Sequence, residues 1–165
     1  MTTDRHRACA AEQIFDQYLQ STHRRRTQER MMVLSCSESM KGHFTAEDVA
    51  NQLQAGHNNV ALATVYSTLD LLTHCGILTA RHFDSGVTYY EKASTPHMHL
   101  VCTVCGKIRD LRDASIDAIV ANRRFSSFTP TRYAMTVYGM CGACAKAVKN
   151  KSKSNKTISK SQKRK

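Results

Sequence analysis

Four cysteines in two pairs constrain the fold of this chain more than any other feature. The pairs are Cys102-x-x-Cys105 and Cys141-x-x-Cys144. Two intervening residues let both thiolates of a pair face one ion, and two such pairs build a closed tetrahedral zinc site. The C-terminal half must therefore fold so that the pairs meet, and we predict a structural zinc site there.

A disulfide framework is the alternative use of these cysteines, and it requires an oxidising compartment. The segment Met1–Ala11 has charged side chains and no apolar run long enough for a signal peptide. The number of cysteines, seven, is odd, and no apolar run is long enough to span a membrane. We therefore expect a cytoplasmic zinc protein in which Cys9, Cys36 and Cys75 are buried structural thiols.

The positive charge of the chain is concentrated at its C-terminus. Nine positive charges, of a formal net charge of +11, lie at residues 146–165, and no acidic residue follows Asp117. Residues 148–165 have almost no apolar surface to bury and are predicted to be disordered. Such a tail can bind nucleic-acid phosphates without reading sequence, or it can serve only as a solubilising extension.

The residues before the cysteines predict short helices followed by a β-hairpin. A second helix is expected near Thr27, and a third at Thr45, where Asp48 three residues later completes a capping box. A fourth helix is expected to include Asn58–Asp70, to carry Val65, Leu69 and Leu72 on one face and to stop at Gly76. Alternating strands and a turn are expected to follow within 77–91. Helices followed by a hairpin are the order of a winged helix-turn-helix domain.

In such a domain the helix before the hairpin enters the major groove, so the helix predicted at Asn58–Asp70 is the candidate reader of DNA sequence. Its polar side chains can bond to bases or phosphates, although an ordinary amphipathic helix presents the same pattern to solvent. Arginines around the start of the second helix add charge where backbone phosphates can lie. The candidate DNA-binding residues are Arg26, Arg30, Asn59, Thr64, Tyr66 and Ser67.

Five fragments of the chain resemble successive signatures of the ferric uptake regulator family. They are Arg26-Thr27-Gln28-Glu29-Arg30, Gly42-His43-Phe44-Thr45-Ala46-Glu47, Ala63-Thr64-Val65-Tyr66, Tyr90-Glu91 and His97-x-His99-Leu100-x-Cys102-x-x-Cys105-Gly106-Lys107. The resemblance runs from about Arg24 to Cys144. It implies an α+β fold with an N-terminal winged helix-turn-helix domain and a C-terminal α/β dimerisation domain, in a homodimeric, metal-responsive repressor.

The resemblance also implies how the chain is divided and what it binds. Residues 1–92 are expected to bind a double-stranded DNA operator, and residues 93–147 to dimerise and bind metal. The second domain is expected to contain strands around Leu100 and Ile108, a helix over Asp113–Phe125 and a strand over Thr131–Tyr138. The expected partners include neither a membrane nor a small-molecule substrate.

Two metal sites follow from the resemblance. A structural Zn²⁺ is assigned to Cys102, Cys105, Cys141 and Cys144. A regulatory Fe²⁺, or another divalent transition metal, is assigned to His43, Glu91, His97, His99 and Asp110. Two histidines two residues apart on a strand project to the same face, and carboxylates beside them complete a nitrogen and oxygen site.

The chain departs from the family pattern at several positions. Ser67 stands where many members have arginine, so one positive contact to DNA is absent. Pro96, Met98 and Met140 replace residues that hold a further metal in parts of the family, and that site is expected to be missing. Glu91, in place of aspartate, favours the iron-sensing branch over the peroxide-sensing one, although a sensor of zinc or manganese can share every ligand.

Two other classes of function were considered for these residues. A zinc bound by histidines and carboxylates can activate water, but the chain has no His-Glu-x-x-His helix, nucleophile motif or phosphate-cradling glycine loop. We therefore do not expect an enzyme. A constitutive zinc-ribbon module that binds nucleic acid through its tail is the other alternative, and its binding is expected to be indifferent to added metal.

Overall fold

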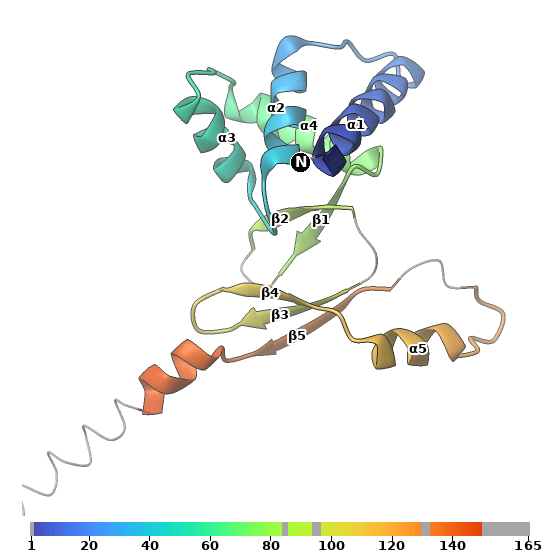
Figure 1. Cartoon of the computed structure of the whole chain (residues 1–165), viewed down its shortest axis with the longest axis vertical. Coiled ribbons are helices and arrows are strands. Elements are labelled where there is room, and N and C mark those ends of the chain that lie inside the picture. The colour runs from blue at the N-terminus through green and yellow to red at the C-terminus, as the bar shows by residue number, and fades with distance from the viewer. Residues whose placement is uncertain (1, 84–85, 94–96, 130–132, 150–165) are drawn as a thin grey trace, which may run out of the picture. The chain divides into compact units, whose positions relative to one another are not determined.

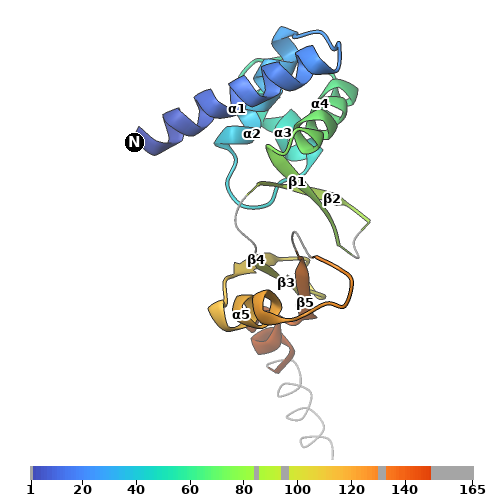
Figure 2. The same cartoon turned by 90° about the vertical axis from the view of Figure 1, so that its right-hand side faces the viewer.

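Two structural units make up the chain in the computed structural model: Met1–Ser94 and Thr95–Lys165. The described residues are 2–83, 86–93, 97–129 and 133–149. Figures 1 and 2 show the elements of both units from two directions. Each unit has its own secondary structure and packing.

The N-terminal unit has the order of a winged helix-turn-helix domain, four helices followed by a hairpin, as the sequence predicted (Figure 1). Its elements are α1 Thr2–Ser21, α2 Gln28–Ser39, α3 Ala46–Ala55, α4 Leu62–His74, β1 Leu78–His82 and β2 Thr88–Lys92.

Local hydrogen bonds fix where the middle helices begin. The Thr45 hydroxyl accepts a bond from the Asp48 N–H, while the Asp48 carboxylate accepts one from the Thr45 N–H, so the predicted capping box of α3 is confirmed. Thr27 caps α2 through the N–H of Arg30. By contrast, α4 begins after Ala61 without a side-chain cap.

The predicted start of α4 at Asn58 is wrong by four residues. The Asn58 N–H bonds to the Leu53 carbonyl at 2.9 Å, and its side-chain amide bonds to the Gly56 carbonyl at 3.2 Å. Both bonds belong to the turn that ends α3, where His57 adopts a positive φ of 58°. Asn59 therefore lies in the loop before α4, not on its polar face.

A continuous apolar core holds the N-terminal unit together. Residues that share the spacing of one helix face are fully buried in α1, such as Phe15 and Leu19, and in α4, such as Val65 and Leu69. The aromatic ring of Phe44 reaches the same core from the loop before α3. Burial of this continuous surface fixes how the four helices pack.

The β1–β2 hairpin, which forms the wing of the domain, is connected to the segment before α3 by an isolated β-bridge. In the hairpin, β1 and β2 pair antiparallel, with Thr79 opposite Glu91 and Arg81 opposite Tyr89. Phe44 and Tyr90 exchange two backbone hydrogen bonds, of 3.0 and 2.7 Å. The residue before Phe44 and the residue after Tyr90 are therefore held close together, and they are two of the predicted metal ligands.

The C-terminal unit is a three-stranded sheet with a helix in its crossover. The strand order is β4-β3-β5, with β3 antiparallel to β4 and parallel to β5. A parallel pair requires a long connection, and α5 lies in it. The elements are β3 Met98–Cys102, β4 Ile108–Leu111, α5 Ala114–Asn122 and β5 Met135–Gly139, followed by a helix at 142–149.

Several expectations about this unit can be compared with the structure. The strands expected around Leu100 and Ile108 are present, and the helix expected over Asp113–Phe125 is shorter, because it is capped by Asp113 and ends before Arg123. The strand expected from Thr131 begins at Met135 in the described part, while 131 and 132 lie outside it.

Two further expectations concern the single cysteines and the tail. Cys36 is buried and Cys75 partly buried, but Cys9 is exposed on α1, so the prediction of a buried thiol there is wrong. The predicted disordered tail lies outside the described residues, except that 148 and 149 end the last helix. Among the described residues, no helix has the length and apolar character needed to cross a membrane.

Candidate metal centres and DNA-binding surface

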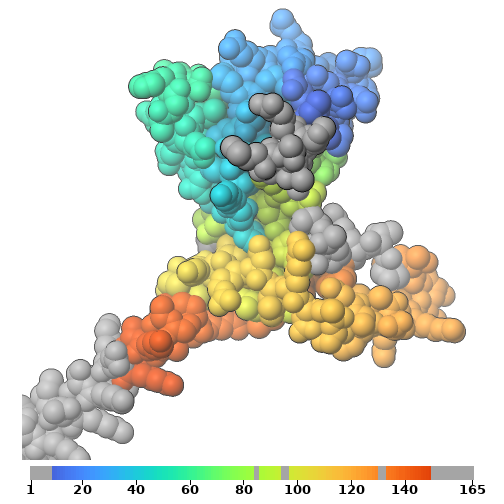
Figure 3. All heavy atoms as spheres, in the orientation of Figure 1, coloured from blue at the N-terminus to red at the C-terminus, as the bar shows by residue number. Residues whose placement is uncertain are grey.

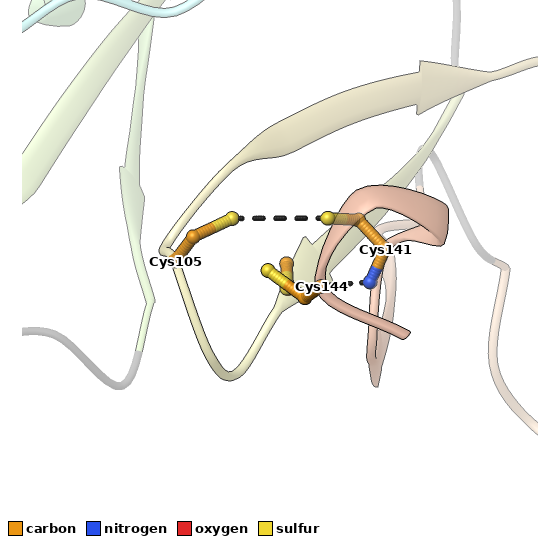
Figure 4. A group of neighbouring side chains, drawn as sticks. Cys105, Cys141 and Cys144 are labelled. Carbon is orange, nitrogen blue, oxygen red and sulfur yellow. Dashed lines mark hydrogen bonds between the residues drawn. The ribbon is translucent and has the colours of Figure 1, made fainter. Parts of the chain in front are cut away.

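The four paired cysteines converge at one end of the C-terminal sheet. Cys102 ends β3 and Cys105 follows in the turn, which closes at Gly106 with a positive φ of 69°. Cys141 and Cys144 come from the start of the helix that follows β5. The four sulfur atoms all lie within 4.8 Å of one another. Figure 4 shows the thiols of Cys105, Cys141 and Cys144 turned toward one another.

Backbone contacts hold the two cysteine segments together. The Thr103 N–H donates to the Gly139 carbonyl at 2.8 Å, continuing the pairing of β3 with β5 up to the cysteines. The Cys141 N–H donates to Cys102 Sγ at 3.3 Å, and Cys105 Sγ lies 3.9 Å from Cys141 Sγ. The pairing of β3 with β5 therefore brings together the two Cys-x-x-Cys segments, called the two knuckles below.

The thiols differ in their readiness to lose a proton. The backbone N–H of Cys141, followed by those of Cys105 and Val104, lowers the pKa of Cys102 to about 6. The thiol of Cys144 has its pKa raised to about 12, chiefly by its hydrogen bond with Cys141. Four sulfurs at this separation, at least one of which favours the thiolate, form the donor set that zinc requires.

Two of the predicted regulatory-metal ligands lie in the N-terminal unit. His43 stands in the loop before α3 and Glu91 on β2, with His43 Nε2 3.2 Å from Glu91 Oε2. Both side chains are more than nine-tenths buried. The other oxygen of the carboxylate, Oε1, accepts a 2.8 Å hydrogen bond from Arg81 Nε on β1.

The C-terminal unit brings together the remaining predicted ligands. His99 on β3 is opposite Asp110 on β4, and the rings of His97 and His99 are 4.7 Å apart between centroids. His97 Nε2 lies 3.8 Å from Asp110 Oδ1. Both histidines are buried. Paired imidazoles beside a carboxylate suit iron, zinc, manganese and similar ions better than calcium.

On the candidate DNA-binding helix α4, the polar side chains already have partners within the unit. The Tyr66 hydroxyl donates to Glu47 Oε1 on α3 at 2.5 Å, and this bond raises the pKa of Tyr66 and lowers that of Glu47. The Ser67 hydroxyl donates to the Thr64 carbonyl at 3.1 Å. Tyr66 and Ser67 therefore present acceptor lone pairs and apolar surface to a ligand, since their protons are used.

The two candidate arginines also make internal contacts. Arg26 Nη2 donates to Glu12 Oε1 at 2.7 Å and Arg26 Nε to Asp16 Oδ1 at 2.8 Å, which raises its pKa and joins α1 to the segment before α2. Arg30 donates to the Arg25 carbonyl. The contact of these arginines with DNA remains a prediction, because their charge is at least partly engaged within the unit.

Arg81 and Glu47 are the two residues that sequence reasoning missed. Arg81 reaches Glu91 only through the register of the hairpin, in which the two positions lie diagonally across the strands. Glu47 and Tyr66 are nineteen residues apart in sequence, and they meet because α3 packs beside α4. From the sequence, Arg81 could be recognised as a charged residue within an alternating strand pattern. That pattern does not show that Glu91 is its partner.

Comparisons with known proteins cover most of both units. The family model described as the ferric uptake regulator family matches residues 21–138. The chain is 36% identical over 110 residues to the ferric uptake regulation protein of Bordetella parapertussis, covering 63% of this chain and 76% of that protein. It is 32% identical over 124 residues to that of Campylobacter upsaliensis, covering 72% and 78%.

The fold agrees with a solved structure of similar description. The ferric uptake regulator from Pseudomonas aeruginosa, determined with manganese, superposes with a TM-score of 0.67 at 27% identity, covering 77% of this chain and 97% of that one. The match to the family model includes all five histidine and carboxylate ligand candidates and the first cysteine pair, and it ends three residues before Cys141.

Proposed function

Because the chain belongs to the ferric uptake regulator family of metal-dependent transcriptional regulators, we propose that it is a repressor that responds to ferrous iron and binds its operator as a homodimer. The observation that carries the proposal is a pair of incomplete ligand sets, one in each unit, whose histidines and glutamate are buried. His43 with Glu91, and His97 with His99 and Asp110, each offer too few donors for a closed metal site alone.

The first part of the proposal is the structural zinc. Cys102, Cys105, Cys141 and Cys144 fit a tetrahedral ion, since all four sulfurs converge and no other metal-binding residue is needed. These cysteines would hold β3, the turn after it and the last helix in one arrangement. Zinc bound to thiolates supplies folding free energy and no catalysis.

The second part is a regulatory site that takes donors from both units. His43 and Glu91 would supply one nitrogen and one oxygen, and His97, His99 and Asp110 would supply the rest. A bound divalent metal supplies coordination bonds that link these side chains. His43 and Glu91 are fixed to the wing and to α3 through the Phe44–Tyr90 bridge, so ligation through them would restrict how the DNA-binding unit is held.

This arrangement accounts for metal-dependent DNA binding without any contact between the metal and DNA. A metal that binds one arrangement of the two units more tightly shifts the population toward it. The distance between the two α4 helices of a dimer would then match successive major grooves of an operator with inverted repeats. By thermodynamic linkage, operator DNA must raise the affinity for the regulatory metal by the same factor.

Iron is proposed as the physiological metal, with zinc, manganese or peroxide sensing as the alternatives within the family. The named relatives from Bordetella and Campylobacter are ferric uptake regulation proteins, and Glu91 agrees with that branch. The ligand chemistry is shared, however, since the solved relative from Pseudomonas was determined with manganese.

The proposed DNA contacts are centred on α4. Tyr66 and Ser67 are exposed on this helix, Thr64 is partly exposed, and Asn59 is exposed in the loop before it. Tyr66 exposes part of its apolar ring, which can pack against a thymine methyl group. Arg26 and Arg30 are proposed to lie near backbone phosphates. Ser67 offers no charge, so α4 itself reads by shape and apolar contact more than by an arginine–guanine pair.

Dimerisation is proposed to use the C-terminal unit. A hollow of about 260 Å³ lies on its sheet, lined mainly by β3, β4, β5 and the second cysteine knuckle. Large apolar side chains of this unit are exposed, among them Val137 on β5, which lines the hollow, and Ile119 on α5. Contiguous exposed apolar surface of this kind marks an interface.

Elemental analysis combined with operator titrations tests the proposal. We expect one tightly held zinc per chain and a second, exchangeable metal, with operator binding that rises when Fe²⁺ is added and falls when it is chelated. Operator binding that is indifferent to metal would instead indicate a constitutive zinc-ribbon module. A stronger response to Zn²⁺ or Mn²⁺ than to Fe²⁺ would keep the family function but reassign the metal.

A further inference from the structure

Arg81 is placed to control how Glu91 binds a metal. Its Nε donates a 2.8 Å hydrogen bond to Glu91 Oε1, across the diagonal of the β1–β2 hairpin. The Glu91 side chain is 7% exposed and the Arg81 side chain 25% exposed. Both side chains are therefore largely shielded from water. In such an environment, a charge-assisted hydrogen bond of this length is strong and directional.

The two oxygens of the Glu91 carboxylate have different surroundings. Oε1 is engaged by Arg81, whereas Oε2 faces His43 Nε2 at 3.2 Å. His43 is itself a proposed metal ligand, so Oε2 is the oxygen on the ligand side of the carboxylate. The Arg81 guanidinium lies on the opposite side and carries a fixed positive charge.

A carboxylate can bind a metal through one oxygen or through both. Bonds from neighbouring residues to a ligand's second atom orient the ligand and tune the metal. We propose that Arg81 is a positioning residue that restricts Glu91 to one-oxygen ligation through Oε2 and thereby sets the metal preference of the regulatory site. This inference rests on the proposed function, because it requires Glu91 to be a ligand.

The direction of the effect follows from ligand chemistry. When Arg81 is removed, Oε1 becomes available and Glu91 can chelate with both oxygens. An added carboxylate oxygen favours ions such as Mn²⁺, which suit oxygen ligands, over ions that prefer imidazole nitrogen in a smaller coordination shell. Loss of Arg81 should therefore weaken Co²⁺ binding, taken as a probe for such ions, more than Mn²⁺ binding.

The test uses the full-length, zinc-loaded protein and the variants Arg81→Gln and Arg81→Lys. Co²⁺ and Mn²⁺ are titrated separately, Co²⁺ by its visible absorption spectrum, which reports coordination number, and Mn²⁺ by electron paramagnetic resonance. Arg124→Gln is the matched control, because it makes the same change at an exposed arginine that belongs to neither the proposed metal ligands nor the proposed DNA contacts.

We expect Arg81→Gln to weaken Co²⁺ binding about 10-fold, to weaken Mn²⁺ binding less, and to alter the Co²⁺ spectrum toward a higher coordination number. Arg81→Lys should give an intermediate change, since lysine keeps the charge but not the planar donor. Arg124→Gln should leave both dissociation constants unchanged. Circular dichroism of each variant confirms that the fold is retained, and Arg81→Lys serves as the test if Arg81→Gln does not fold.

Two negative results have different meanings. If the unsubstituted protein binds Co²⁺ and Mn²⁺ at the second site, and both Arg81 variants match it in affinity and spectrum, the role of Arg81 is overturned while the proposed function stands. If the unsubstituted, zinc-loaded protein binds neither ion at a second site, the regulatory site and the inference fail together.

Discussion

The two units of the chain differ in how much of their apolar surface they bury. In the N-terminal unit, α1 to α4 and the hairpin contribute to a single core in which residues such as Phe15, Val65 and Leu69 are fully buried. In the described part of the C-terminal unit, the buried hydrophobic residues are Met98, Val101 and Cys102, all on β3.

The helices show the same contrast. Five residues of α4 are buried, whereas none of α5 is. On the face shown in Figure 3, the side chains of α5, in gold, lie at the edge of their unit and uncovered by its sheet. A small domain with few buried residues needs a metal or a partner chain to be stable. We therefore expect the N-terminal unit to fold through its own core, and the C-terminal unit to depend on the proposed zinc site and dimer.

Loss of the cysteine cluster should have the largest effect, and it should be confined to one unit. Cys102→Ser and Cys141→Ser are each expected to abolish zinc retention, unfold the C-terminal unit and dissociate the dimer, because zinc bonding supplies much of the folding free energy of such a unit. Elemental analysis, light scattering and hydrogen exchange measure the three effects.

The control for this prediction is Cys75→Ser, which changes a partly buried thiol of the N-terminal unit that lies outside the cluster. It should retain zinc and the dimer. Amides of α2 and α4 should stay protected in both cluster variants. Loss of protection in those helices would show that the two units do not fold independently.

A matched pair of leucine truncations tests the difference in packing directly. Leu69→Ala, in the core of the N-terminal unit, should lower the free energy of unfolding by about 3 kcal/mol, because it leaves a cavity. Leu111→Ala, at a position 40% exposed on β4, should cost about 0.5 kcal/mol or less. Urea unfolding followed by circular dichroism measures both. Equal costs would mean that the C-terminal unit has a better core than its exposed side chains indicate.

A charge on α5 tests whether a second copy of the chain covers this helix. Ile119 is 68% exposed, so Ile119→Asp should leave the isolated chain folded but raise the dimer dissociation constant about 10-fold or more. Sedimentation equilibrium measures the constant. Ile14→Asp is the matched control, since Ile14 is 46% exposed on α1 of the other unit. If both substitutions leave the dimer unchanged, α5 lies outside the interface.

Contacts between residues that are close in sequence were predictable, whereas contacts between residues that are distant in sequence were not. The capping box of Thr45 and Asp48 was predicted correctly because both partners lie within one helical turn. The start of α4 was predicted wrongly because Asn58 bonds backward to the turn after α3, and a polar residue is equally compatible with either role. The two knuckles were predictable from spacing, whereas no local pattern pairs Arg81 with Glu91.

Loss of a helix cap should have different consequences in the two units, and one of these consequences depends on pH. Thr45→Ala removes the capping box of α3 and should cost about 1 kcal/mol, with α3 remaining helical because its buried face holds it. Asp113 caps α5 alone, accepting a 2.9 Å bond from the Ser115 N–H, and α5 has no buried residue to hold it. Asp113→Ala should therefore unwind the first turn of α5 without a comparable change in global stability.

Acid should reproduce the Asp113→Ala effect. Hydrogen bonds from the Ser115 hydroxyl and N–H lower the pKa of Asp113, so its carboxylate caps the helix at neutral pH, and the cap is lost as the pH falls through that lowered pKa. Hydrogen exchange at the start of α5, corrected for its intrinsic pH dependence, measures both effects. At neutral pH, the amides there should be protected in the unsubstituted protein and unprotected in Asp113→Ala. Acid should remove the protection from the unsubstituted protein and cause no further loss in Asp113→Ala. Full protection of α5 in Asp113→Ala at neutral pH would mean that packing, and not the cap, holds this helix, and the contrast between the units would then be smaller than their burial indicates.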